Sequence, residues 1–249
     1  MHFSETSLSA ILVAAAAATG AKGCTHDPVD LTINFVALGH GIQNYTCTSQ
    51  NATATFIGAL AVLYDITPLH PGCTGTSLSV DDFNGLSAQV LWDSEIPLNL
   101  VDASAAGPGS CLPGPCYQAD SANPFPASPS DLALNGITAK FLGLHYFDAE
   151  SSPTFDLVGG ADTMGLFFSG TKTGEVEAPS DADRGVLATG AVKWLQLGGN
   201  GRGLSKGIAQ VYRVVTAGGA APACSDSGAN GPWQTLSVPY AAQYWFYSP

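Results

Sequence analysis

Charged residues are scarce in this chain of 249 residues, and basic ones are the scarcest. Only 11% of the positions are charged, with 8 Lys and Arg against 20 Asp and Glu, which gives a formal net charge of −12. An acidic surface of this kind repels a phosphate backbone, so we expect no nucleic-acid partner. Intrinsic disorder is also excluded, because 45% of the residues are hydrophobic and can form a core.

Long apolar runs are missing too. The longest, LSAILVAAAAA at 8–18, is followed by the small residues Thr19-Gly20-Ala21. A membrane-spanning helix needs about twenty apolar residues, whereas a short run that ends in small residues is typical of a secretory signal peptide. We therefore expect a signal peptide at 1–21, no membrane partner, and a secreted chain 22–249 that works extracellularly or in the cell wall. The alternative is a buried N-terminal helix.

The cysteines fit an exported protein. Six are present, an even number that favours disulfides over the weaker alternative of zinc, since C-x₄-C without a second pair is a poor zinc pattern. Cys111 and Cys116 flank a Pro-Gly turn and are expected to pair with each other. The pairing of the other four is left open: these are Cys24, Cys47, Cys73 and Cys224.

Two N-glycosylation acceptors lie close together in the chain. Asn44 and Asn51 each begin an Asn-x-Thr triplet. Because such triplets are glycosylated on the secretory route, both asparagines are expected sites if the chain is exported.

Helical periodicity is absent after the leader, and strand patterns replace it. Segments of alternating or continuous apolar residues are separated by clusters of Gly, Pro, Ser and Asp, which break helices. The predicted strands cover 31–35, 56–64, 88–92, 137–147, 164–168, 192–197, 208–215 and 240–247. The sequence predicts an all-β protein, a single-domain β-sandwich or barrel at 22–249 with a long Pro/Gly-rich loop at about 102–131. That loop could instead separate two domains.

The motifs of common enzyme classes are missing as well. There is no G-x-S-x-G, no H-E-x-x-H and no G-x-G-x-x-G before a helix, so we expect no metal and no cofactor. The glycine-rich segment 198–203 is interpreted as a hairpin connector. His40, in Leu38–Gly41, is placed in a flexible turn where it could bind a metal or contact a ligand.

One histidine stands out as an acid–base candidate. If the strand that starts at Ile137 keeps its register, His145 shares a face with Ala139, Phe141 and Phe147, and is buried or lines a cavity. An enzyme would use His145 together with Tyr146 and a carboxylate such as Asp65. The alternative is a core histidine satisfied by a backbone carbonyl.

Paired carboxylates offer a second kind of chemistry. Glu175 and Glu177, two apart on a strand, would share a face at a spacing that suits glycoside cleavage, which needs carboxyls about 5–10 Å apart. In an acidic protein such pairs also arise simply to solvate the surface.

Aromatic residues are concentrated at the C-terminus. Alternation along 240–247 would place Tyr240, Tyr244 and Phe246 on one face and Trp245 and Tyr247 on the other. Such rings can stack on a sugar or a flat organic molecule, or they can fill a core. The candidate ligand-binding residues are Gln43, Tyr45, Tyr244 and Trp245.

Five segments spread over the chain resemble a known family. They are GHGIQNYTC at 39–47, AVLYD at 61–65, GLHYF at 143–147, QVYRV at 210–214 and VPYAAQYWFY at 238–247. In this order they are similar to a family of secreted fungal proteins known mainly as a domain of unknown function, often labelled malate dehydrogenase by automated transfer. The resemblance implies an extracellular fungal protein and supplies no catalytic residues. The dehydrogenase label is not expected to hold, because the sequence has no dinucleotide fingerprint and no βαβ alternation.

We therefore expect a non-catalytic protein, associated with the extracellular space or the cell wall. We expect a secreted β-protein that binds a carbohydrate or a small apolar ligand. The alternative is a cofactor-independent enzyme, either polysaccharide-cleaving or an isomerase or cyclase, that uses His145 in a cavity.

Overall fold

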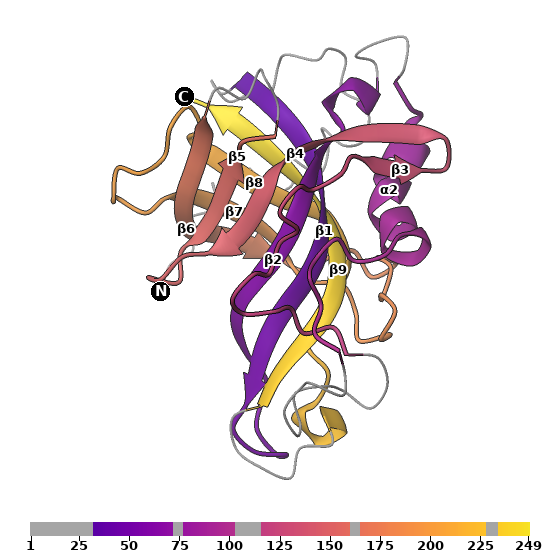
Figure 1. Cartoon of the computed structure of the whole chain (residues 1–249), viewed down its shortest axis with the longest axis vertical. Coiled ribbons are helices and arrows are strands. Elements are labelled where there is room, and N and C mark those ends of the chain that lie inside the picture. The colour runs from indigo at the N-terminus through magenta and orange to yellow at the C-terminus, as the bar shows by residue number, and fades with distance from the viewer. Residues whose placement is uncertain (1–31, 72–76, 103–115, 160–164, 228–233) are drawn as a thin grey trace.

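One antiparallel sheet curves round and closes on itself. The computed structural model describes residues 32–71, 77–102, 116–159, 165–227 and 234–249 (Figure 1). Within these ranges, nine strands form a sheet in the order β2-β1-β9-β8-β7-β6-β5-β4-β3, and an extra pairing of β2 with β4 closes eight of them into a ring. The prediction of an all-β sandwich or barrel is confirmed.

The elements follow in chain order. The strands are β1 Thr32–Cys47, β2 Thr55–Asp65, β3 Leu132–Leu134, β4 Ile137–Phe147, β5 Pro153–Leu157, β6 Leu166–Val176, β7 Trp194–Gly199, β8 Gln210–Gly218 and β9 Gln234–Ser248. The helices are α2 Val80–Asp93 and the short 3₁₀ helices η1 Thr67–Leu69 and η2 Cys224–Ser227. Most predicted strands coincide with these. Of the predicted connector 198–203, residues 200–203 lie between β7 and β8, whereas Gly198 and Gly199 are the last residues of β7.

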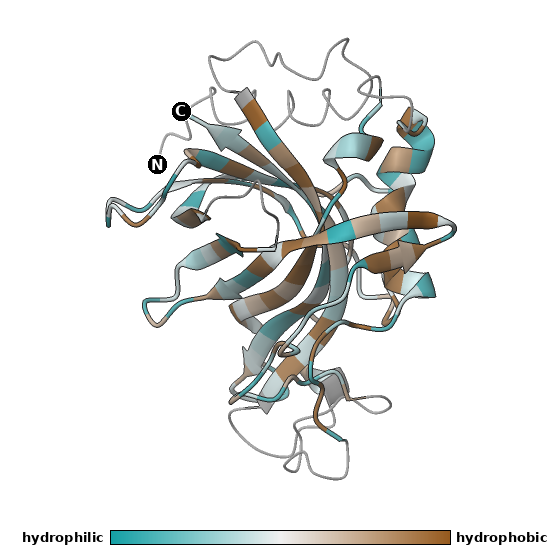
Figure 2. Cartoon of the chain, turned by 45° about the horizontal axis from the view of Figure 1, so that its top comes forward, coloured by the Kyte–Doolittle hydropathy of each residue, from teal (hydrophilic) through white to brown (hydrophobic). Residues whose placement is uncertain are grey.

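The two faces of the sheet bury different side chains. Along β9, Tyr240, Tyr244 and Phe246 pack inside the ring, whereas Trp245 and Tyr247 pack on its outer face, as the alternation predicts. Apolar positions run through the long strands, and hydrophilic ones are frequent at the turns (Figure 2). The ring therefore has an interior core and a separate exterior core.

The exterior core contains a helix that the sequence analysis missed. Residues 88–92, predicted as a strand, belong to α2, which lies against β1, β8 and β9 (Figure 1). The helix begins at Ser79, whose side-chain oxygen accepts a hydrogen bond from the Asp82 backbone N–H at 3.1 Å. Phe83, Leu86 and Val90 then fall on one face, at helical spacing, and are buried against the sheet.

A β-bulge overturns part of the register predicted for β4. Leu63 of β2 pairs with Gly143 and the next residue, Tyr64, pairs with Phe141, so one residue of β4 is extra. Because an extra residue reverses the inside–outside alternation, Ala139 and Phe141 pack in the exterior core instead of sharing a face with His145. His145 and Phe147 remain on the inner face.

The segment around His40 is a central strand and not the turn that was predicted. Residues 38–41 pair with β2 on one side and β9 on the other. His40 is 1% exposed, neither ring nitrogen has a hydrogen-bond partner among the described residues, and burial lowers its pKa to about 4. Because Leu38 and Ile42 pack in the exterior core, alternation along β1 places the His40 side chain on the outer face and not in the interior.

One disulfide is defined at the lower end of the ring in Figure 1. Cys47, the last residue of β1, is bonded to Cys224, the first residue of η2. Cys116 is also disulfide-bonded. Cys111, the predicted partner of Cys116, lies outside the described ranges. Cys24, Cys73 and the expected signal peptide also lie outside them. Residues 116–131 of the predicted loop include one isolated bridge, between Ala119 and Leu100.

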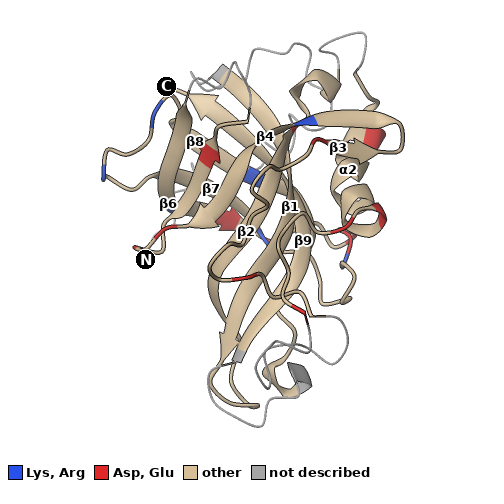
Figure 3. Ribbon diagram, viewed as in Figure 1, with Lys and Arg blue, Asp and Glu red and all other residues tan. Residues whose placement is uncertain are grey.

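Charges are sparse on the long strands. Neither β1 nor β9 contains Asp, Glu, Lys or Arg, and most of the ribbon in Figure 3 is uncharged. Among the described residues, no helix is long and apolar enough to span a bilayer.

Gly41 provides a test of the tight pairing of β1 with β2. A Cβ at this position would lie 1.9 Å from the Leu60 carbonyl oxygen and 2.7 Å from the Ala61 Cα, so backbone would have to move. We predict that Gly41→Ala lowers the free energy of unfolding by about 1–3 kcal/mol or more, measured by urea denaturation. Gly199→Ala is the matched control, because a Cβ there has no neighbour within 4 Å. Equal effects of the two substitutions would contradict the proposed close approach.

Candidate functional site

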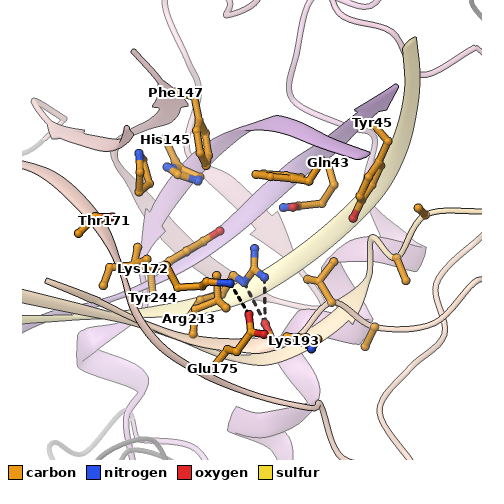
Figure 4. A pocket seen from close by; sticks show the side chains of 18 of the residues that line it. Gln43, Tyr45, His145, Phe147, Thr171, Lys172, Glu175, Lys193, Arg213 and Tyr244 are labelled. Atoms are coloured by element: carbon orange, nitrogen blue, oxygen red, sulfur yellow. Dashed lines mark hydrogen bonds and ion pairs between the residues drawn. The ribbon is translucent and has the colours of Figure 1, made fainter. Parts of the chain in front are cut away.

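A cavity of about 600 Å³ opens into the interior of the ring. Each of the eight ring strands contributes to its wall, with Gln43 and Tyr45 from β1, His145 from β4, Arg213 from β8 and Tyr244 from β9 among the lining residues (Figure 4). Small-molecule sites in proteins have volumes of about 300–1,000 Å³. The cavity is therefore large enough for a ligand of ordinary size.

One wall of the cavity is aromatic. The imidazole of His145 is stacked on the Phe155 ring, with 4.2 Å between centroids and 10° between planes, and its centroid lies 5.4 Å from that of Tyr244. Phe56 bridges Phe147 and Tyr45 through edge-on contacts at 5.3 and 5.7 Å. These rings present a continuous apolar surface to anything that enters the cavity.

His145 is held as a neutral ring. Its Nδ1 lies 2.9 Å from the Thr154 carbonyl oxygen, and since a carbonyl can only accept, Nδ1 carries the proton and donates. Nε2 is then an acceptor. The side chain is 3% exposed, and burial lowers its pKa to about 3 although the hydrogen bond to Thr154 opposes the shift. At neutral pH this histidine can accept a hydrogen bond from a ligand but is a weak base.

Positive charge is concentrated at the same cavity. Arg213, Lys172 and Lys193 all line it, which is three of the eight basic residues in the chain. Arg213 is 8% exposed, and its Nε and Nη2 donate to the Lys193 carbonyl oxygen at 3.2 and 2.9 Å. In Figure 4, Arg213 and Tyr244 lie between the aromatic wall and the two lysines.

Both candidate carboxylates are engaged with the lysines. Glu175 contacts Lys172 at 2.6 Å and Lys193 at 3.2 Å, while Glu177 contacts Lys193 at 2.8 Å. The hydrogen bond from Lys172, together with that from Lys193, lowers the pKa of Glu175. A glycosidase acid needs a raised pKa, so this pair lies at the cavity but is poorly suited to glycoside cleavage.

Tyr45, Tyr244 and Gln43 complete the polar part of the lining, and Tyr240 is a neighbour of Tyr244 behind it. The Tyr45 hydroxyl donates to the Gly219 carbonyl oxygen at 2.7 Å, and the Tyr240 and Tyr244 hydroxyls are 2.8 Å apart. Burial raises the pKa of Tyr45 to about 12, so its hydroxyl stays protonated. Gln43 is 1% exposed, and its Nε2 has no hydrogen-bond partner among the described residues.

The structure brings some predicted site residues together and places others elsewhere. Gln43, Tyr45, Tyr244 and His145 converge on the cavity, but Trp245 does not. Trp245 packs in the exterior core, where its Nε1 donates to Gln243 at 3.1 Å. Adjacent strand residues point to opposite faces, which separates Trp245 from Tyr244.

The proposed helpers of His145 are not beside it. Tyr146 is the next residue in β4 and does not line the cavity. Asp65 is at the end of β2, where its carboxylate accepts a hydrogen bond from the Thr67 backbone N–H at 2.9 Å. Within the described residues, no carboxylate is hydrogen-bonded to His145, so the predicted catalytic set is not assembled.

Arg213 is the residue that the sequence analysis overlooked. It stands in the buried segment Val211–Val214 of a chain that has only eight basic residues. A single charge inside an otherwise apolar strand costs free energy unless it is partnered or functional, and this signal was available from the sequence.

The two predicted glycosylation sites differ in their surroundings. Asn51 is exposed in the β1–β2 turn, whereas the side-chain oxygen of Asn44, in the middle of the sheet, accepts a hydrogen bond from Ser237 at 2.7 Å. Across the described parts of the chain, no three His, Cys, Asp or Glu side chains are grouped as a metal site.

The neutral state of His145 leads to a pH prediction. Its pKa is about 3 in the fold and about 6.5 when unfolded, so the unfolded chain gains a proton first as the pH falls. Stability that is complete above pH 6.5 is lost towards pH 3. We predict that His145→Phe, which keeps the stacked ring, loses less stability than the wild type between pH 7 and 4.5, by up to about 1.4 kcal/mol per pH unit. Urea denaturation at several pH values measures this, and parallel pH profiles would show that His145 is not buried and neutral.

Comparison with known proteins gives one match. Neither the curated proteins nor the solved structures contain a match to this chain. The malate dehydrogenase label receives no support, and the strand pairs of the ring are all antiparallel, unlike a dinucleotide-binding βαβ unit. A family described as a protein of unknown function, DUF3455, matches residues 28–248, which include every described element. The chain therefore belongs to the DUF3455 family of proteins of unknown function.

Proposed function

We propose that this protein binds a small, ring-bearing and largely apolar organic molecule in the interior of the ring. The observation that supports this is the cavity of about 600 Å³ to which all eight ring strands contribute. An aromatic wall with polar and charged side chains beside it can hold and orient a small molecule.

An apolar ligand fits the cavity better than a carbohydrate. A sugar presents hydroxyls on all sides and needs polar partners around its edge. Here the charged side chains are Arg213, the two lysines and the glutamates bound to them, whereas Phe56, Phe147 and Phe155 offer apolar surface without partners for hydroxyls. Burying apolar surface against those rings contributes about 25 cal/mol per Å².

Binding also fits the side chains better than catalysis does. A general base works best with a pKa near the working pH, but the pKa of His145 is about 3. The carboxylates at the cavity, Glu175 and Glu177, are bound to lysines. The alternative of an enzyme that uses His145 as its acid–base group thus lacks an activated residue in the described part of the site.

The binding proposal predicts that filling the cavity mouth abolishes binding. Thr171 is exposed and lines the cavity, so Thr171→Trp places a large ring at the opening without disturbing the core. Ligand-observed NMR with a library of cyclic organic compounds should give hits in the wild type that disappear in Thr171→Trp. Thr138→Trp, at an exposed position on β4 away from the cavity, should retain them. The proposal fails if no compound binds at millimolar concentration, or if both variants bind alike.

We further propose that the protein acts outside the cell. This rests on the leader at 8–18, on the Cys47–Cys224 disulfide, which is typical of oxidising compartments, and on the exposed triplet at Asn51.

Expression in a eukaryotic secretory host tests the export proposal. We predict a secreted product whose N-terminus lies near Ala21 and which carries a glycan on Asn51, seen as a mass shift that Asn51→Gln removes. Asn44→Gln is the matched control and should leave most of the glycan mass, since Asn44 is hydrogen-bonded within the sheet. A product retained in the cells with Met1 in place would contradict export.

A further inference from the structure

We propose that the ligand of this cavity carries a single carboxylate, which docks on the guanidinium of Arg213 beside the amide of Gln43. This inference rests on the proposed binding function and adds the chemical class of the ligand.

Arg213 is a buried positive charge without a carboxylate partner in the described part of the chain. A buried charge is normally paired, because an unpaired one loses its hydration without compensation. Yet no Asp or Glu among the described residues lies within 4.0 Å of this guanidinium, which is 8% exposed. The cavity that Arg213 lines is the place from which a counterion can reach it.

The Arg213 guanidinium has N–H groups that no protein acceptor uses. A guanidinium has five N–H groups, and two of those of Arg213 donate to the Lys193 carbonyl oxygen. Even with one more directed at the neighbouring Tyr244 hydroxyl, at least two N–H groups remain for a ligand. Two N–H groups on a planar fork match the two oxygens of a carboxylate.

The side-chain amide of Gln43 is a second hydrogen-bond donor at the cavity. Gln43 is 1% exposed and lines the cavity, and its Nε2 makes no hydrogen bond of 3.5 Å or less among the described residues. Even with one N–H directed at the neighbouring Tyr240 hydroxyl, the second N–H of the amide remains for a ligand. An unsatisfied buried amide is costly, whereas an incoming acceptor would satisfy it. Figure 4 shows Gln43 and Arg213 in the same part of the cavity, with the Tyr45 ring beyond Gln43.

The charge balance favours a monoanion. Arg213, Lys172 and Lys193 carry three positive charges, and Glu175 and Glu177 carry two negative ones, which leaves 3 − 2 = +1 at a cavity in a chain of net charge −12. One carboxylate neutralises this excess, but a phosphate dianion would reverse it. The aromatic wall then accommodates the apolar ring of the same molecule.

Matched acids and amides test the inference on the unaltered protein. The probes are benzoate with benzamide, and cyclohexanecarboxylate with cyclohexanecarboxamide, titrated by calorimetry into the full chain at pH 7 and low salt. Each pair has the same shape and differs in charge. We expect the acid to bind about tenfold more tightly or better, since a charge-assisted bidentate contact is lost in the amide. Salt should weaken this preference only modestly, because the guanidinium is buried.

Variants assign the preference to Arg213. Arg213→Met should bind acid and amide equally, and Arg213→Lys should retain part of the preference because it retains the charge. Lys140→Met is the matched control: it also removes one positive charge, but from an exposed ion pair with Asp131, and it should behave as the wild type. Should Arg213→Met fail to fold, Gln43→Met gives a second measurement, in which we expect the preference to fall several-fold.

The possible results separate the two proposals. Acid binding without amide binding, lost in Arg213→Met, supports the inference. Equal binding of acid and amide to the wild type overturns it but leaves the cavity as a binding site. Binding of neither, together with no hit from the wider library, overturns the binding function itself.

Discussion

The pairing of β2 with β4 is the contact on which the rest of the structure depends. Without it the sheet would be an open ribbon from β2 to β3, and there would be no interior. With it, the inner residues of eight strands face one another across a common space. The bulge opposite Leu63 lies within this pairing, and it sets which side chains of β4 turn inward. The closure of the ring and the inward direction of the His145 side chain are therefore determined by the same few residues.

Closure also explains why the interior can hold a charge. The interior core includes the small residues Ala37, Ala59, Ala61 and Ala242, which take up less space than larger side chains would. Arg213 lines the cavity in this interior and is anchored by the Lys193 carbonyl oxygen. The result is a donor-rich site inside an acidic molecule. The charge of the site is thus opposite to the charge of the surface, a difference that favours the entry of anions once they reach the opening.

The strands were predictable because they depend on local alternation. The segment 240–247 alternates cleanly, and both of its faces were assigned correctly. The face shared by Ala139 and His145 was not predictable, because a bulge is determined by the partner strand and leaves no periodic trace. Helix α2 did leave a trace, in Ser79 three residues before Asp82 and in the spacing of Phe83, Leu86 and Val90, but Val and Gly within it resemble strand and turn residues.

The candidate site was half predictable for a similar reason. His145, Gln43, Tyr45 and Tyr244 were recognised from residue type and segment, but their convergence depends on strands more than a hundred residues apart. Tyr146 is the sequence neighbour of His145, which in a strand places it on the opposite face. Asp65 was chosen as a carboxylate without a predicted position, and it lies at the end of β2. Trp245 was named beside Tyr244 as a ligand-binding residue although their alternation places the two on opposite faces, and only Tyr244 lines the cavity.

The order of the strands has a consequence for how the chain matures. β1 and β9, the first and last strands of the ring, lie side by side, with Gly41 paired to Tyr240 about two hundred positions later. The ring cannot close on β1 before β9 has been synthesised. Such a high contact order makes acquisition of the final state slow. A polypeptide whose ring stays open until β9 has been synthesised is also one that a translocation channel, which admits only unfolded chains, can thread.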